Sequence, residues 1–193
     1  HTSTAKRLAI YPEYKAGRVK PPEDFYAQIP YLKELILALG WDFLEADEYE
    51  ADDIIGTLAR QADEKHDYMT YIVSSDLDML QIVDENNKMY RLLKGFSNIE
   101  EMDIQAIEEK YGILKSQFLD LKALKGDNSD NIPGVPGIGE KTAVKLLNQY
   151  GDIQGIYDHI EEITGSTQKK LVEGKDSALM SYRLAKIMTD APV

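Results

Sequence analysis

The chain has 193 residues, of which 43% are hydrophobic, 34 are acidic and 22 are basic, so its formal net charge is −12. This composition is sufficient for a globular core, and the negative charge argues against attachment to DNA through a generally basic surface, although bound divalent ions and a local basic patch would still let DNA approach. The absence of cysteine excludes disulfides and thiolate metal sites, and no apolar stretch is long enough to cross a membrane. No signal peptide is visible, so a cytoplasmic protein is expected.

The first half of the chain alternates helical and strand patterns. Apolar residues recur at helical spacing between residues 32 and 39 and predict a helix from about Glu23 to Gly40. A short strand, a second helix and two further strands are predicted at residues 41–44, 55–62, 68–75 and 88–93. This alternation predicts an α/β fold with a parallel-sheet core covered by helices.

The second half of the chain is predicted to be entirely helical. Asp103 and Ser116 are the expected N-caps of two of its helices. The predicted helices cover residues 103–111, 116–125, 140–150, 152–163 and 169–188. The change in pattern near residues 95–102 predicts an α/β core over residues 1–98 and a helical subdomain over residues 99–193.

Seven carboxylates gather in three short motifs at the edges of apolar segments. They are Glu50, Asp52 and Asp53 in EADD, Asp76 and Asp78 in SSDLD, and Asp127 and Asp130 in GDNSDN. Such crowding of acids opposes folding unless cations bind there. Hard oxygen ligands suit Mg²⁺ or Mn²⁺, so a shared divalent-metal site is predicted.

The position of each acid refines this prediction. Asp52 precedes the apolar stripe of the second helix and is expected to point inward, where it needs a partner. Asp76 and Asp78 directly follow a buried strand, at the edge where α/β folds gather their sites. Capping of a helix and ordinary turn formation are the alternative interpretations for these acids.

A glycine-punctuated turn, PGVPGIGEKTA, leads into the helix that begins at Glu140. Such turns present backbone amides to phosphate, and neighbouring lysines add positive charge. The predicted DNA-binding residues are Gly137, Ile138, Gly139, Lys141, Thr142 and Lys145. A simple connector between two helices is the alternative.

The motifs EADDIIGTLA, IVSSDLDMLQ and LKGDNSDNIPGVPGIGEKTA together resemble the 5′-nuclease family. The similarity extends from YPEYKAGR to the closing TDAPV, and the branch it resembles most includes the 5′–3′ exonuclease domain of bacterial DNA polymerase I. The resemblance implies a structure-specific 5′–3′ exonuclease or flap endonuclease of DNA replication and repair. It also implies a bacterial cytoplasmic location and a polymerase domain that follows in the same polypeptide.

The resemblance further implies roles for individual residues. Acids matching Glu50, Asp52 and Asp53 hold one metal ion or bridge two, and the other four acids of the clusters hold the second ion. Lys15 and Arg18 fall where the family places cations that steer the scissile phosphate. The glycine turn resembles a helix-hairpin-helix loop that binds K⁺ against duplex DNA, and the implied substrate is DNA with a 5′ flap or a 5′ end beside a duplex.

One departure from the family pattern bears on activity. Members carry two further metal-binding aspartates upstream of YKAGR, the first on the opening strand of the sheet, and this sequence begins at His1 without them. The first metal site is therefore expected to be incomplete, with weak cleavage. A DNA-binding module without catalysis is one rival interpretation. A phosphatase that uses Asp76-Leu77-Asp78 is the other, although it leaves GDNSDN and GIGEKTA unexplained.

Overall fold

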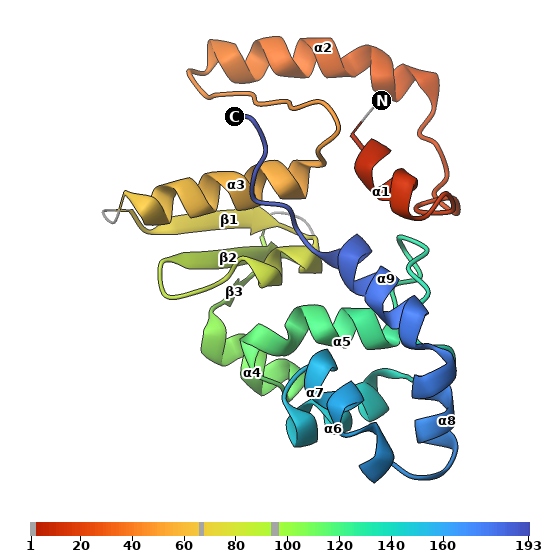
Figure 1. Ribbon diagram of the computed structural model, residues 1–193. Helices are drawn as coiled ribbons and strands as arrows, with labels where there is room; N and C mark the ends of the chain where they lie inside the picture. Colours follow the sequence, from red (N-terminus) through yellow and green to blue (C-terminus); the bar gives the residue numbers. More distant parts are fainter. Residues whose placement is uncertain (1–2, 66–67, 94–96) are drawn as a thin grey trace.

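A computed structural model describes residues 3–65, 68–93 and 97–193 (Figure 1). The first half contains α1 (Ala5–Ile10), α2 (Glu23–Ala38), α3 (Ala51–Glu64), β1 (Thr70–Ser74), the 3₁₀ helix η1 (Leu77–Gln81), β2 (Asn87–Leu92) and β3 (Ile99–Met102). The second half contains α4 (Ile104–Tyr111), η2 (Lys115–Gln117), α5 (Phe118–Lys125), α6 (Glu140–Tyr150), α7 (Ile153–Asp158), η3 (Ile160–Glu162), α8 (Gly165–Glu173) and α9 (Lys175–Ala185). An α/β portion followed by a helical portion is therefore confirmed.

The described strands form one small mixed sheet in the order β1-β2-β3. β1 pairs with β2 in parallel, with Ile72 opposite Met89, which confirms the predicted parallel pairing. β3 pairs with β2 in the antiparallel direction, with Met102 opposite Met89, and this edge was not predicted. In Figure 1, α3 lies along the β1 side of the sheet and the helical portion lies below β3.

Several predicted boundaries are corrected by the structure. Residues 41–46 form no strand, since β1, β2 and β3 pair only with one another among the described residues, and Trp41 is 67% exposed. Ser116 does not cap a helix but lies inside η2, so that α5 begins only at Phe118. The predicted helix over 169–188 is two helices divided at Gly174, and the one predicted over 152–163 is α7 followed by η3.

Two of the apolar cores lie beside the sheet and within the helical portion. The core beside the sheet is built from Ile72, Met79, Leu80, Val83, Met89, Met102, Ile107, Phe118 and Ile187. The helical core gathers larger aliphatic side chains of α5 to α9, among them Leu121, Leu124, Leu147, Ile156 and Leu171. Tyr111, the last residue of α4, packs against both cores and so lies at the junction of the two halves.

The segment after α9 runs back along α3 (Figure 1). The Met188 N–H donates to Asp53 Oδ1 at 2.8 Å, and the Ala191 N–H donates to Thr57 Oγ1 at 3.0 Å. These hydrogen bonds fix the N-terminal half of α3, which carries the first acidic motif. No helix among the described residues is long and apolar enough to cross a membrane.

Candidate metal centre

Asp76 and Asp78 lie at the carboxyl end of β1, where the chain turns into η1. Asp76 is the N-cap of η1, and its side chain accepts a hydrogen bond from the Asp78 N–H at 3.0 Å. The Asp76 N–H in turn donates to Ser74 Oγ at 3.0 Å. This local hydrogen bonding explains why an Asp-x-Asp sequence follows the strand, because an Asp N-cap satisfies an amide that the helix leaves unpaired.

Asp52, from the first turn of α3, completes a group of three carboxylates. One oxygen from each of Asp52, Asp76 and Asp78 lies within 4.8 Å of the others, and no other group of this kind is found among the described residues. Burial, together with the negative charges of Asp76 and Asp78, raises the pKa of Asp52 to about 7. Three oxygen ligands at this spacing fit a divalent cation, which would offset their mutual repulsion.

Lys122 is the cation that this structure places against the acids, and the sequence analysis missed it. Its ammonium group donates to Asp78 and lies 2.8 Å from Asp127 Oδ2, although its side chain is only 6% exposed. Burial opposes ionisation of Asp127, but hydrogen bonds from Lys122 and Ser129 outweigh it and lower the pKa of Asp127 to about 2. A sequence signal existed, since Lys122 lies within the otherwise apolar stretch from Leu121 to Leu124 of α5.

Glu50 and Asp130 form a second acidic pair beside the first group. The Tyr14 O–H lies 3.2 Å from both Glu50 Oε2 and Asp130 Oδ2. Lys15 Nζ is 2.7 Å from Glu50 Oε2 and 3.6 Å from Asp130 Oδ2, while Arg18 pairs with Asp130. The structure therefore groups Asp130 with cations from the N-terminal segment and places Asp52, rather than Asp130, with Asp76 and Asp78.

Asp53 does not face the other acids, and the expectation that it binds metal does not fit this geometry. Its side chain is fully buried, and both oxygens accept hydrogen bonds from Arg7, at 2.7 and 2.8 Å. The Glu50 and Met188 N–H groups also donate to it. The sequence analysis expected Asp52 to point inward and find a partner. In the structure, Asp53 holds this position.

The predicted hairpin residues lie at the start of α6 and are mostly exposed. Gly137, with φ +80°, and Gly139 are open to solvent, as are Lys141 and Lys145, and Thr142 is half-buried. Ile138 is the exception. Its side chain is 3% exposed in the helical core and its N–H donates to Val135 O at 3.0 Å, so neither its side chain nor its N–H is free for a ligand.

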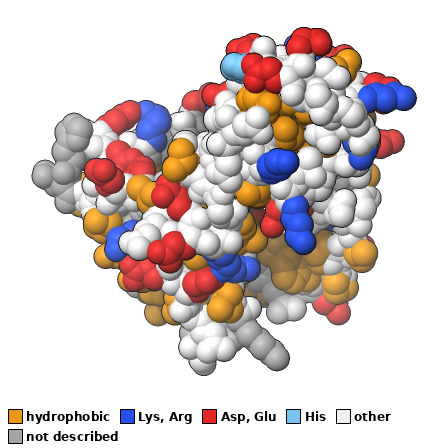
Figure 2. Space-filling view, turned by 90° about the horizontal axis from the view of Figure 1, so that it is seen from below, with side chains coloured by type: hydrophobic (Ala, Val, Ile, Leu, Met, Phe, Trp, Pro, Cys, Tyr) orange, Lys and Arg blue, Asp and Glu red, His pale blue; other side chains and the backbone are white. Residues whose placement is uncertain are grey.

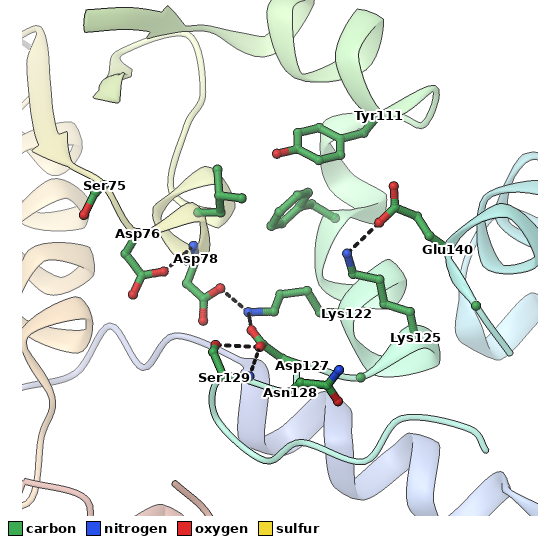
Figure 3. Close-up of a pocket in the computed structure, with 14 residues that line it drawn as sticks. Ser75, Asp76, Asp78, Tyr111, Lys122, Lys125, Asp127, Asn128, Ser129 and Glu140 are labelled. Atoms are coloured by element: carbon green, nitrogen blue, oxygen red, sulfur yellow. Dashed lines mark hydrogen bonds and ion pairs between the residues drawn. The ribbon is translucent and has the colours of Figure 1, made fainter. Parts of the chain in front are cut away.

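A cavity of about 650 Å³ joins the metal-binding acids to the hairpin. Asp76, Asp78 and Asp127 line one end, and Gly139 and Glu140 line the other. Figure 3 shows the aspartates around Lys122, with the Lys125–Glu140 ion pair on the opposite side of the cavity. On the face seen from below, basic and acidic side chains are interspersed, so that face carries no uniform basic patch (Figure 2).

Comparison with known proteins adds independent information. The model of the 5′-3′ exonuclease N-terminal resolvase-like domain matches residues 1–112, and that of the 5′-3′ exonuclease C-terminal SAM fold matches residues 113–193. DNA polymerase I of Bacillus subtilis is 44% identical over 191 residues, and that of Lactococcus lactis strain MG1363 is 43% identical over 192. Each alignment covers 98% of this chain and 22% of the polymerase, so the chain spans about a fifth of these relatives.

Two solved structures share the fold. T5 5′-exonuclease, with divalent zinc ions bound, matches 96% of this chain and 71% of its own, with a TM-score of 0.79 and 23% identity. The catalytic core of Rad2 in complex with a DNA substrate matches 94% of this chain and 62% of its own, with a TM-score of 0.60 and 18% identity. The predicted combination of an α/β portion with a helical subdomain is thus that of known nucleases.

Proposed function

Because the chain belongs to the 5′-3′ exonuclease family, we propose that it is a metal-dependent 5′-nuclease that hydrolyses DNA phosphodiesters beside a 5′ end or flap. The observation that carries this proposal is the carboxylate group of Asp52, Asp76 and Asp78, whose oxygens lie within 4.8 Å of one another. Asp52 of α3 meets Asp76 and Asp78 of the η1 turn at the end of β1, and capping of η1 by Asp76 does not require Asp52 to be there. A divalent cation explains the convergence.

The proposed ions are Mg²⁺ or Mn²⁺, two in the complete site, held by Glu50, Asp52, Asp76, Asp78, Asp127 and Asp130. Glu50 Oε1 supports this assignment, because it is a buried oxygen without a hydrogen-bond partner in the described chain. An orphaned acceptor of this kind is satisfied by a cation or by water bound to one. When bound, two such ions supply an activated water and stabilise the leaving oxygen of an in-line attack on phosphorus.

The residues of this chain supply positioning and charge. Lys15 and Arg18 bring cations to the rim of the site, and the Arg18 side chain is 52% exposed, so it can reach a phosphate while it remains near Asp130. Lys122 balances Asp78 and Asp127 and holds their carboxylates in place. We assign the scissile phosphate to the space between these cations and the carboxylates.

The hairpin is proposed to hold duplex DNA downstream of the cut. Gly137 and Gly139 leave the backbone open to a phosphate, and Lys141, Thr142 and Lys145 follow on the first turns of α6, where K⁺ bridges the hairpin to the DNA in this proposal. These contacts position DNA without reading its sequence. By the same inference, the biological role is DNA replication and repair in the bacterial cytoplasm, as part of a polypeptide that also carries a polymerase.

The experiment is cleavage of a labelled 5′-flap duplex in Mg²⁺ by the unaltered chain, by Asp78→Asn and by a control, Asp42→Asn. Asp42 is an exposed acid of the α2–α3 connection, outside the site. We expect slow release of the flap that requires Mg²⁺, a further loss of rate of at least 100-fold in Asp78→Asn, and no effect of the control substitution. Tight flap binding without cleavage would instead indicate a binding module. Turnover of para-nitrophenyl phosphate would indicate a phosphatase.

A further inference from the structure

The cavity between the metal-binding acids and the hairpin has one apolar wall. Neither the scissile phosphate proposed at the acids nor the duplex phosphate proposed at the hairpin accounts for it. Its two ends are polar, with Asp76 and Asp78 at one and Gly139 and Glu140 at the other. Between them, the wall is formed by Leu77, Phe118 and Tyr111. A DNA strand that runs from the carboxylates to the hairpin has to cross this apolar wall.

Tyr111 presents the polarizable surface of that wall. Its ring is half-buried and meets Phe118 edge to face, with ring centroids 5.3 Å apart and an interplanar angle of 75°. Its phenol makes no hydrogen bond within the described part of the chain. Figure 3 shows the Tyr111 ring on the side of the cavity away from Asp127 and Ser129. Tyr111 packs against both core clusters, which holds the ring in place.

The charge near Tyr111 suits the phosphate backbone of a nucleotide, and the Tyr111 ring suits its base. Lys125 Nζ lies 2.7 Å from Glu140 Oε2 at the hairpin end of the cavity, and the Lys125 side chain is 30% exposed. This ammonium can approach a phosphate of the strand, whereas an aromatic wall offers nothing to a phosphate. Aromatic rings bind nucleobases of any sequence by stacking. A cavity of about 650 Å³ has room for a nucleotide.

We propose that Tyr111 is a substrate-binding residue, against whose ring the nucleobase on the 3′ side of the scissile phosphate stacks. This inference rests on the proposed function, because that function places the scissile phosphate at the carboxylates and the duplex at the hairpin. It assigns a base-binding subsite to the cavity. This subsite would bind any of the four nucleobases by stacking, without distinguishing between them.

The test measures the affinity of the unaltered chain and of three variants for flap DNA in Ca²⁺, which is used in place of Mg²⁺ to permit binding without cleavage. Tyr111→Phe keeps the ring, and Tyr111→Leu keeps apolar volume without it. Tyr182→Leu is the matched control, because Tyr182 is also a half-buried tyrosine of the helical core but lines a different cavity. Each protein is measured on a normal flap and on one with an abasic site immediately 3′ of the scissile phosphate. Thermal melting establishes that each variant is folded.

We expect Tyr111→Leu to weaken binding of the normal flap about 10-fold, in the range typical of base stacking, with no effect on the abasic flap. Tyr111→Phe should match the unaltered chain on both substrates, and so should Tyr182→Leu. An equal loss on normal and abasic DNA would overturn the inference and leave Tyr111 a purely structural residue. Absence of DNA binding by the unaltered chain would contradict the proposed function itself, and with it the base subsite.

Discussion

Replacing Arg7 with Met should be the most damaging single change to the stability of this chain. Arg7 is 5% exposed and Asp53 is fully buried, and their two hydrogen bonds measure 2.7 and 2.8 Å. Arg7 Nε and Nη2 also donate to Leu184 O and Lys186 O, both at 3.0 Å, so one guanidinium joins α1, α3 and the C-terminal segment. Met keeps the apolar volume but removes every one of these donors.

The cost follows from what the substitution leaves behind. Without Arg7, the Asp53 carboxylate stays buried with only the Glu50 and Met188 N–H groups as donors. Breaking a buried pair by removal of one partner typically costs about 3–5 kcal/mol, against about 5–15 kcal/mol for the whole free energy of unfolding of a domain. We therefore expect Arg7→Met to lose at least about a fifth of the total stability.

Urea denaturation at pH 7 measures this cost, with Lys33→Met as the control. Lys33 and Glu45 form an ion pair whose side chains are 42% and 66% exposed, so that variant should lose about 1 kcal/mol or less. The double variant Arg7→Met with Asp53→Asn should recover part of the loss, since no charge is then left buried. A loss for Arg7→Met no larger than for the control would refute this account of the pair.

The hydrogen bonds from Arg7 outweigh burial and lower the pKa of Asp53, so the stability this pair contributes is present above pH 4 and is lost as pH falls through the lowered value; urea titrations from pH 7 to 3 should show it. Burial raises the pKa of Asp120 from 3.8 to about 6, so Asp120→Asn should stabilise the chain by about 1–3 kcal/mol at pH 7.5 and by nothing near pH 3, and an equal effect at both values would contradict this. Lys122→Met should lower stability without metal and increase the gain in melting temperature on addition of Mn²⁺, because a competing cation is removed; an unchanged gain would show that Lys122 does not compete. Gly137→Ala and Gly139→Ala should both weaken duplex binding regardless of base sequence, yet only the first should lower the melting temperature, since its Cβ would lie 2.9 Å from Lys170 Cε at φ +80°, whereas space around Gly139 is open.

Local patterns in the sequence predicted much of the helical half. The helix over Glu140–Tyr150 has the predicted bounds, and Asp103 caps α4 as expected, with its side chain accepting from the Ala106 N–H. Both signals are short-range, because caps and helical periodicity act within a few residues. The parallel pairing of β1 with β2 agrees with the predicted parallel sheet, although the alternation behind that prediction included a strand over residues 41–44 that does not form.

What the sequence analysis missed depends on contacts between distant segments. The inward acid of α3 is Asp53 rather than Asp52, because Asp53 pairs with Arg7. Arg7 lies 46 residues away in the sequence, and helical periodicity in the first turn does not tell which of two adjacent acids points inward. Lys122 is similar, since its burial is offset only by Asp78 and Asp127, from other parts of the chain. Ile138 was assigned to DNA from the motif alone, whereas packing in the helical core uses its side chain.

The central claim is that Asp52, Asp76 and Asp78 together bind a divalent cation. Crystals of this chain soaked in Mn²⁺, with diffraction measured at the manganese absorption edge, test it most directly. We predict an anomalous peak among these three carboxylates, at bonding distance from at least two of them, and its loss in Asp78→Asn. Manganese that binds only elsewhere, or a peak that persists unchanged in the variant, would contradict the assignment.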